Sequence, residues 1–268
     1  MAGVPWLPMW RAVAVGFMAN NILPARAGEV ARAWILSRGA PVRMSSALAS
    51  IVMERVFDTF AIIGLMSFAL VSDTLPADVL VGGMPVRRLA ATVGAVFAAL
   101  LLVMLLVAWR PGPWLAALDG IGRRLLPERF AAKLADVGRG LVDGLSVLRA
   151  PGRLPGVAAW SLVLWLVNAA AFWLGFRALH LDLPFEAALL MQGLIAFGIA
   201  IPSSPGFFGV FEAVAIVALG FYGVDKDHAV SYAIVYHITT FIPITLLGLQ
   251  ALAQSQARLS DLREAPAA

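Results

Sequence analysis

The amino-acid sequence predicts an all-α integral membrane protein with about six or seven membrane segments, one or two of them re-entrant or broken, and a possible inverted repeat. Three observations support this class. Of the 268 residues, 61% are hydrophobic and 13% are charged, which is too apolar for a soluble globular domain. Several stretches are long and apolar enough to cross a bilayer, and Pro and Gly break two others. We expect one polytopic membrane domain over residues 1–257, with a cytoplasmic loop at 110–153, and a cytoplasmic tail at 258–268.

Composition also excludes several kinds of chemistry. The chain has no cysteine, so disulfides, thiolate catalysis and Cys-ligated metals are excluded, and three scattered histidines do not form a His-rich metal site. No G-x-x-x-x-G-K-[ST] motif is present, so P-loop nucleotide hydrolysis is not expected. The net charge of +4 comes from loop Lys and Arg, which favours anionic lipid over nucleic acid. We therefore predict no cofactor, no metal and no nucleic-acid partner.

The first apolar stretch, residues 12–25, is uncharged but short. Its 14 residues would span about 21 Å as a helix, less than a hydrocarbon core of about 30 Å. Asn20, Asn21 and Pro24 would leave polar groups unpaired in lipid, which is tolerated only beside protein or a water-filled cavity. We interpret this stretch as a re-entrant or truncated element, and no cleavable signal peptide is expected before it.

Two long apolar segments follow. Residues 44–72 can cross the membrane but carry Glu54, Arg55 and Asp58 in their middle, whereas residues 89–109 contain 21 uncharged residues and form the plainest transmembrane helix.

The segment at 110–153 is the most basic part of the chain, with eight of the 20 Lys and Arg residues. Over residues 127–149, apolar side chains recur at steps of three and four, with charged residues between them. This pattern predicts an amphipathic helix. It either lies on anionic lipid headgroups or caps the helix bundle.

Three further apolar segments complete the chain. Residues 154–176 form an uncharged span, and residues 187–224 carry only one charge, Glu212, but are broken by a Pro- and Gly-rich stretch at 201–209. Either two complete helices meet at this break or two half-helices form a hairpin. The last span, residues 229–257, is interrupted by His237 and Pro243.

The distribution of positive charge predicts the orientation. Residues 24–43, the loop at 110–153 and the tail hold 14 of the 20 Lys and Arg residues, whereas the opposite loops are mostly acidic. The positive-inside rule therefore predicts a cytoplasmic C-terminus and leaves the N-terminus unplaced.

The two Pro- and Gly-containing breaks are alike. Glu29 follows the first break and precedes Arg55 by 26 residues, and Glu212 follows the second and precedes His237 by 25. This spacing fits an inverted repeat with discontinuous helices, although two Pro and Gly turns can also resemble each other by chance. Helix N-termini at such breaks offer N–H groups to phosphate. The predicted phosphate-binding break residues are Pro24, Gly28, Pro202, Ser203, Ser204, Pro205, Gly206 and Gly209.

The charges of the third segment allow two interpretations. Glu54 and Asp58 lie four residues apart, on one helix face, and Arg55 can reach Asp58. Because a charge at mid-bilayer costs about 3 kcal/mol, these groups should face the protein interior and be paired. They form either an ion-pair lock to Arg26 or Arg32 or the wall of a polar pathway, and both can hold together. His237 is either a titratable pathway residue or a hydrogen-bonded core residue.

The motifs together resemble the lysylphosphatidylglycerol synthase transmembrane, or flippase-like, domain family. The resemblance rests on N-x-x-L-P-A-R-A-G-E-x-x-R at 20–32, E-R-x-x-D at 54–58, P-S-S-P-G-x-x-G-x-F-E at 202–212 and Y-H-x-x-T at 236–240. It implies a bacterial inner-membrane protein that moves lipids or lipid-linked headgroups between leaflets, with re-entrant helices around a central cavity. His237 departs from the family's usual Tyr-Arg, and members usually begin with further membrane sequence.

The leading functional hypothesis is therefore lipid translocation. Guanidinium groups would bind the headgroup phosphate and carboxylates would line the route, the cations being Arg26, Arg32 and Arg55 and the acids Glu29, Glu54, Asp58 and Glu212. A separate lipid synthase is a candidate partner, because the synthase domain of aminoacylating members is missing from this sequence. We further expect Glu29 and Arg55 to converge with Glu212 and His237 near the membrane midplane.

Two other functions remain open. One is an integral-membrane enzyme that modifies lipid headgroups, with Glu54 and Asp58 as acid and base. The other is a transporter of a small solute, which would need a wide aqueous cavity closed off from lipid. A groove open sideways to the bilayer would favour translocation.

Overall fold

The computed structural model describes residues 4–23, 27–75, 80–81, 83–85, 88, 92, 95–96, 99, 102–103, 106–107, 109–125, 127–132, 135, 154–200 and 204–255. Four predicted site residues, Pro24, Arg26, Pro202 and Ser203, lie outside these ranges, as do the tail at 258–268 and most of the predicted helix at 127–149. The described residues confirm an all-helical architecture, apart from two strands of two residues each.

The first three helices form a short hairpin and a long helix. Helix α1 covers Trp6–Ile22, α2 covers Gly28–Gly39, and α3 covers the 28 residues Met44–Val71. Helix α1 begins six residues before the predicted element. Its 17 residues span about 25 Å, so it is still short for a hydrocarbon core.

The middle of the chain is described in pieces. Strands β1 (Leu80–Val81) and β2 (Met84–Pro85) pair antiparallel. The described positions from 88 to 107 and residue 109 are helical, as are residues 128–132 and 135, and helix α5 covers Pro111–Leu125.

The second part of the chain contains four helices and a tight turn. Helix α7 covers Leu154–Ala178, α8 covers Phe185–Gly198, the 3-10 turn η2 covers Pro205–Phe207, α9 covers Val210–Gly220 and α10 covers Lys226–Ala253. Helix α10 begins three residues earlier than predicted because the Asp225 side chain accepts the N–H groups of Asp227 and His228. It continues through His237 and Pro243.

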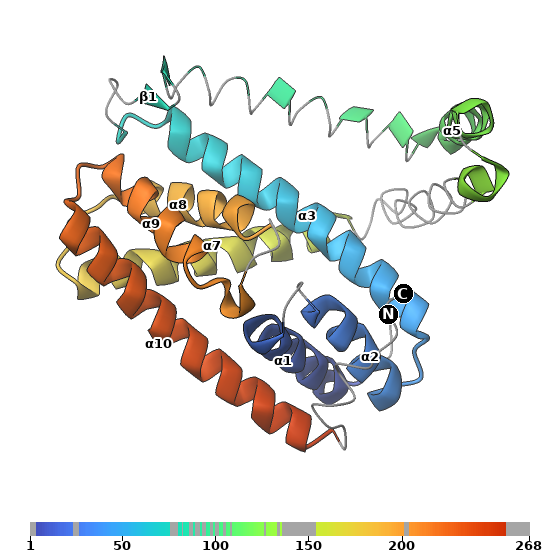
Figure 1. Cartoon of the computed structure of the whole chain (residues 1–268), viewed down its shortest axis with the longest axis horizontal. Helices are drawn as coiled ribbons and strands as arrows, with labels where there is room; N and C mark the ends of the chain where they lie inside the picture. Colours follow the sequence, from blue (N-terminus) through green and yellow to red (C-terminus); the bar gives the residue numbers. More distant parts are fainter. Residues whose placement is uncertain are drawn as a thin grey trace.

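Two groups of three helices match each other in order and packing. In each, two short helices form a hairpin and a 28-residue helix follows: α1, α2 and α3 in one, α8, α9 and α10 in the other. Within each group the second short helix packs on the long helix, and between the groups α1 packs on α10 and α8 on α3. Both hairpins therefore lie between α3 and α10 (Figure 1).

The two hairpins point toward each other. The first opens near the C-terminal end of α10, where Arg11 donates a long hydrogen bond of 3.4 Å to Gln254. The second opens near the N-terminal end of α10, because α9 ends at Gly220 and α10 begins at Lys226. Their tips meet at Gly206, where an added Cβ would lie 3.2 Å from the carbonyl oxygen of Asn21.

Helix length and charge distinguish the candidate membrane spans. Among the described residues, two helices are long and apolar enough to cross a membrane, α7 over Pro155–Ala178 and α10. Helix α3 is as long as α10 but carries three charges at its centre. Helices α8 and α9 have 14 and 11 residues, about 21 and 17 Å, so the hairpin alternative for this segment fits better than two complete helices.

Candidate functional site

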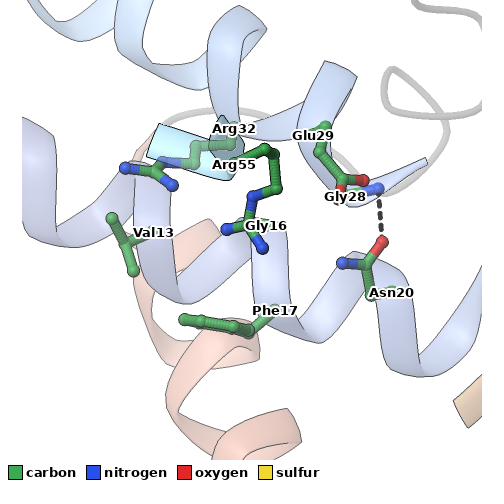
Figure 2. Close-up of a pocket in the computed structure, with 8 residues that line it drawn as sticks. All are labelled: Val13, Gly16, Phe17, Asn20, Gly28, Glu29, Arg32 and Arg55. Atoms are coloured by element: carbon green, nitrogen blue, oxygen red, sulfur yellow. Dashed lines mark hydrogen bonds between the residues drawn. The ribbon is translucent and has the colours of Figure 1, made fainter. Parts of the chain in front are cut away.

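A small polar cavity lies where α1, α2 and α3 meet. Its volume is about 20 Å³, enough for one water molecule. Figure 2 shows the Arg32 and Arg55 side chains in the same space as Glu29 and Asn20. The remaining lining residues are Val13, Gly16, Phe17 and Gly28.

Glu54 holds both arginines of this cavity. Arg32 donates through Nη1 and Nη2 to the two Glu54 carboxylate oxygens, each at 2.7 Å, and Arg55 Nη2 donates to Glu54 Oε1 at 3.0 Å. A bidentate pair of this kind is the strongest protein ion-pair geometry. The predicted ion-pair lock between α3 and Arg32 is therefore present.

Asp58 continues the network into α7. Its side chain is buried, with 3% of the residue exposed, and Oδ1 accepts a hydrogen bond of 3.0 Å from Ser161 Oγ. Arg55 Nη2 lies 3.8 Å from Asp58 Oδ2. Two guanidinium groups thus stand against three carboxylates when Glu29 is included, so a phosphate would have to compete with Glu54 for these cations.

A large groove runs between α3 and α7 beside this network. Its volume is about 1030 Å³. The charged residues that line it are Glu54 and Asp58, and the other polar ones are Ser50 and Ser161. The other lining residues are Ala49, Met53, Phe57, Gly156, Val157, Trp160, Val163, Leu164 and Val167. Most of the α7 side chains among them are exposed, Trp160 by 76%. The groove is therefore an apolar surface channel with a carboxylate edge.

The tip of the second hairpin is built around two glycines. Gly206 and Gly209 have φ angles of 66° and 87°, a region that glycine adopts without steric cost. Ser204 Oγ donates to the Phe208 carbonyl at 2.6 Å, and the Gly209 N–H donates to Glu212 Oε2 at 2.6 Å. Pro205 is the first residue of η2. Glu212 therefore caps the helix in which it lies.

Glu212 also binds His237. Its Oε1 lies 2.6 Å from His237 Nδ1, which joins α9 to α10. The His237 side chain is 8% exposed, and its ring packs against Phe208 and Phe211 at centroid distances of 4.6 and 4.5 Å. His237 is thus a buried residue that forms a hydrogen bond with Glu212, as one of the two interpretations of the sequence predicted.

A second cavity, of about 220 Å³, lies beside His237. Gln192 of α8 faces it, is 1% exposed and was missed by sequence reasoning, because an amide adds no charge to an apolar stretch. The sequence nevertheless contains a signal for this residue, because Gln192 has the only side-chain amide in α8. Asn21, Asn168 and Thr240 also line this cavity.

The four residues expected to converge occupy two neighbouring places rather than one cavity. Glu29 and Arg55 line the first cavity, whereas Glu212 and His237 pair beside the second. The adjacent residues Asn20 and Asn21 connect them. Asn20 Oδ1 accepts the Gly28 N–H at 2.9 Å, and Asn21 Nδ2 donates to Thr245 Oγ1 at 2.9 Å.

The helix N-termini at both breaks are partly occupied by the chain itself. The Gly28 N–H is bound by Asn20 and the Gly209 N–H by Glu212. Phosphate binding at these breaks remains a prediction, and it would require other N–H groups or displacement of these side chains.

Among the described residues, two helices long and apolar enough to cross a membrane, together with shorter apolar helices, indicate a helical membrane protein. The chain belongs to the family described as lysylphosphatidylglycerol synthase TM region, whose model matches residues 2–248.

Relatives with curated descriptions are membrane proteins of archaea. Two UPF0104 membrane proteins of Methanothermobacter thermautotrophicus are 24% and 27% identical to this chain, each over 92% of it and over 75% and 74% of their own length. A UPF0104 membrane protein of Methanocaldococcus jannaschii is 24% identical over 85% of this chain and 90% of its own length. No solved structure matches the chain. These names give a membrane location and no activity.

Proposed function

We propose that this protein moves a phospholipid or a lipid-linked headgroup between membrane leaflets without catalysing a covalent reaction. The observation that carries the proposal is the groove between α3 and α7, which combines an exposed apolar wall with a carboxylate edge. Acyl chains could stay against the apolar wall, in contact with lipid, while the headgroup follows the polar edge. A small-solute transporter would instead need an aqueous cavity enclosed by protein.

The polar edge of the groove adjoins the small cavity at the first hairpin. Glu54 lines the groove and binds Arg32 and Arg55, which line the small cavity at the first hairpin. A headgroup phosphate that exchanges with Glu54 would gain two guanidinium partners. The same contacts argue against Glu54 as a general base, because both of its oxygens already accept charged hydrogen bonds.

The membrane arrangement in this proposal follows from the hairpins. We place α3, α7 and α10 across the bilayer and the two hairpins as re-entrant elements that enter from opposite faces as an inverted repeat. With the basic loops inside, the C-terminus is cytoplasmic. The family resemblance, and not the charge pattern, is the ground for proposing the bacterial inner, or plasma, membrane. The basic segment at 110–153 would contact anionic headgroups, and a separate synthase would supply the lipid.

Leaflet accessibility of labelled phospholipids in proteoliposomes tests the proposal. We expect wild type to equilibrate the label, and Arg55→Ala and Glu29→Ala to slow it by about tenfold or more, as loss of a charged contact of a few kcal/mol predicts. If folded variants transport at the wild-type rate, the site assignment is wrong. If the wild type moves none of the tested lipids, the translocase proposal is wrong.

A groove-filling variant separates the groove from the arginine site. Val163 lines the groove and is half exposed, so Val163→Trp should obstruct it and slow lipid movement. Leu246→Trp is the matched control, because Leu246 is exposed on α10 and lines none of the cavities described above. Equal rates for the two variants would contradict a route along the groove.

A further inference from the structure

The second cavity contains a polar group that nothing in the described part of the chain satisfies. Neither amide atom of Gln192, Nε2 or Oε1, has a hydrogen-bond partner there, although the residue is buried. An unsatisfied buried polar group costs about 1–3 kcal/mol. The cavity volume of about 220 Å³ is enough for several water molecules. Water therefore fits the cavity and would satisfy Gln192.

The cavity water would meet a side chain that can accept a proton. His237 lines the cavity, and its Nδ1 is bound to Glu212, which leaves Nε2 as the nitrogen that can receive a proton. Imidazolium would be stabilised by the Glu212 carboxylate and by the faces of the adjacent Phe208 and Phe211 rings. Histidine is also the side chain whose charge ordinarily changes near neutral pH.

No other described charge competes for this position. The elements packed on α10 are α1, α7, α9 and, through the Phe208 ring, the hairpin tip. The titratable or charged groups of these neighbouring elements are Arg11 of α1, which lies beside Gln254, Arg177 of α7, which pairs with Asp182, and Glu212 of α9. Those of α10 itself, besides His237, are Lys226, Asp227 and His228 in its first turn, and Tyr232 and Tyr236. Among the described residues, only Glu212 forms a hydrogen bond or ion pair with the His237 side chain.

The two matching groups of helices differ at this position. Arg55 lies eleven residues after Met44, where α3 begins, and His237 lies eleven residues after Lys226, where α10 begins. Glu29 and Glu212 lie in the first turns of α2 and α9. One half therefore places a permanent cation beside its hairpin, and the other places a cation that depends on protonation.

We propose that the Glu212–His237 pair is a proton-binding site supplied by water in the Gln192 cavity, and that its protonation drives lipid movement. The second part rests on the proposed function. An excess proton from bulk solvent is relayed along the cavity water and adds to Nε2, Nδ1–H remains donated to Glu212, the water molecules are regenerated, and no bond between heavy atoms changes. Because Glu212 also accepts the Gly209 N–H, the charge on His237 acts directly on the tip of the second hairpin.

The first test observes the proton without transport. The chain has three histidines, so His180→Asn with His228→Gln leaves His237 as the only imidazole for ¹⁵N NMR of the full chain in nanodiscs. We expect one titration between pH 5 and 9, shifted in Glu212→Gln and, if that variant is unstable, in Glu212→Asp. His228 in the otherwise wild-type chain is the matched control, since it pairs with Asp225 on the surface. An imidazole that keeps one protonation state over this range would overturn the site.

The second test measures coupling in proteoliposomes. For one proton per lipid, a gradient of one pH unit should give about a tenfold difference of labelled lipid between leaflets. His237→Gln and His237→Arg should abolish this difference while lipid still equilibrates. Gln192→Leu should slow its build-up several-fold, and Gln250→Leu, on the exposed end of α10, should not.

The two proposals fail in different ways. If wild type moves lipid but a pH gradient leaves equal amounts of labelled lipid in the two leaflets, the proposal that protonation drives the movement is wrong and the translocase proposal stands. If no lipid moves, the translocase proposal is wrong, and the NMR titration alone decides whether the pair binds a proton.

Discussion

At the scale of single residues, the charged side chains of α3 form the ion pairs and hydrogen bonds that charges in an apolar helix require. A carboxylate in an apolar helix needs a cation, and Glu54 has two, Arg32 and Arg55. A cation from the preceding hairpin, Arg26 or Arg32, could therefore be predicted from the sequence as a partner, and the structure shows Arg32 in this place. The near balance between guanidinium and carboxylate groups in this network could not be predicted, because it depends on which side chains face one another. This balance limits phosphate binding by the two arginines, because Glu54 already occupies them.

The Arg32–Glu54 pair should couple strongly in a double-mutant cycle. We expect Arg32→Met or Glu54→Met to cost about 1.5–3 kcal/mol in unfolding free energy, because each leaves a half-buried charge without its main partner. The double variant should cost less than the sum of the two. The exposed Arg123–Asp119 pair on α5 is the control, with an expected coupling of about 0.5 kcal/mol or less. Equal coupling in both pairs would contradict a lock.

Gly28 should be intolerant of a side chain. A Cβ at this position would overlap the carbonyl oxygen of Gly16 and lie 2.5 Å from Asn20 Oδ1. We expect Gly28→Ala to cost about 1–3 kcal/mol by overpacking and to open the first hairpin. Gly64→Ala is the control: nothing lies within 4 Å of its added Cβ, so it should gain about 0.5–1 kcal/mol. Thermal unfolding in one detergent measures both, and a stable Gly28→Ala would contradict the close approach.

At the scale of elements, apolar length predicted the helices well and their ends less well. Helices α3 and α7 lie close to the predicted boundaries, because uncharged runs end where loops begin. Helix α10 extends into polar residues that hydropathy assigns to a loop, since the Asp225 cap and not apolarity fixes its start. Hydropathy also could not identify Gln192, whose importance comes from its burial without a partner.

The start of α10 should depend on pH through Asp225. Hydrogen bonds from the His228 backbone and side chain lower the pKa of this carboxyl. A lowered folded-state pKa gives stability that is present above the ordinary aspartate pKa of about 3.9 and is lost as pH falls through the lower value.

Amide exchange at Asp227 and His228, corrected for intrinsic rates, should therefore be more protected at pH 6 than at pH 3. Asp225→Asn keeps a capping oxygen without a charge, so its protection should not change with pH. An equal loss of protection in both proteins would assign the effect to another group.

At the scale of the whole molecule, the sequence predicted two similar breaks and a possible inverted repeat, but not which helices pack against each other. The spacings from Glu29 to Arg55 and from Glu212 to His237 reflect two matching groups of helices. Short apolar helices have the same hydropathy in either direction, so the opposite directions of the two hairpins are visible only in the packing of α1 on α10 and α8 on α3 (Figure 1).

Opposed entry predicts a pattern of cysteine accessibility that the chain is well suited to report, because it has no native cysteine. Arg38→Cys lies at the open end of the first hairpin, and His180→Cys and Lys226→Cys lie at the open end of the second; all three positions are exposed. In intact cells, a membrane-impermeant maleimide should label the last two and should label Arg38→Cys only after permeabilisation. Labelling of Arg38→Cys and His180→Cys from the same face would show that the hairpins enter from one side and that the halves are not inverted.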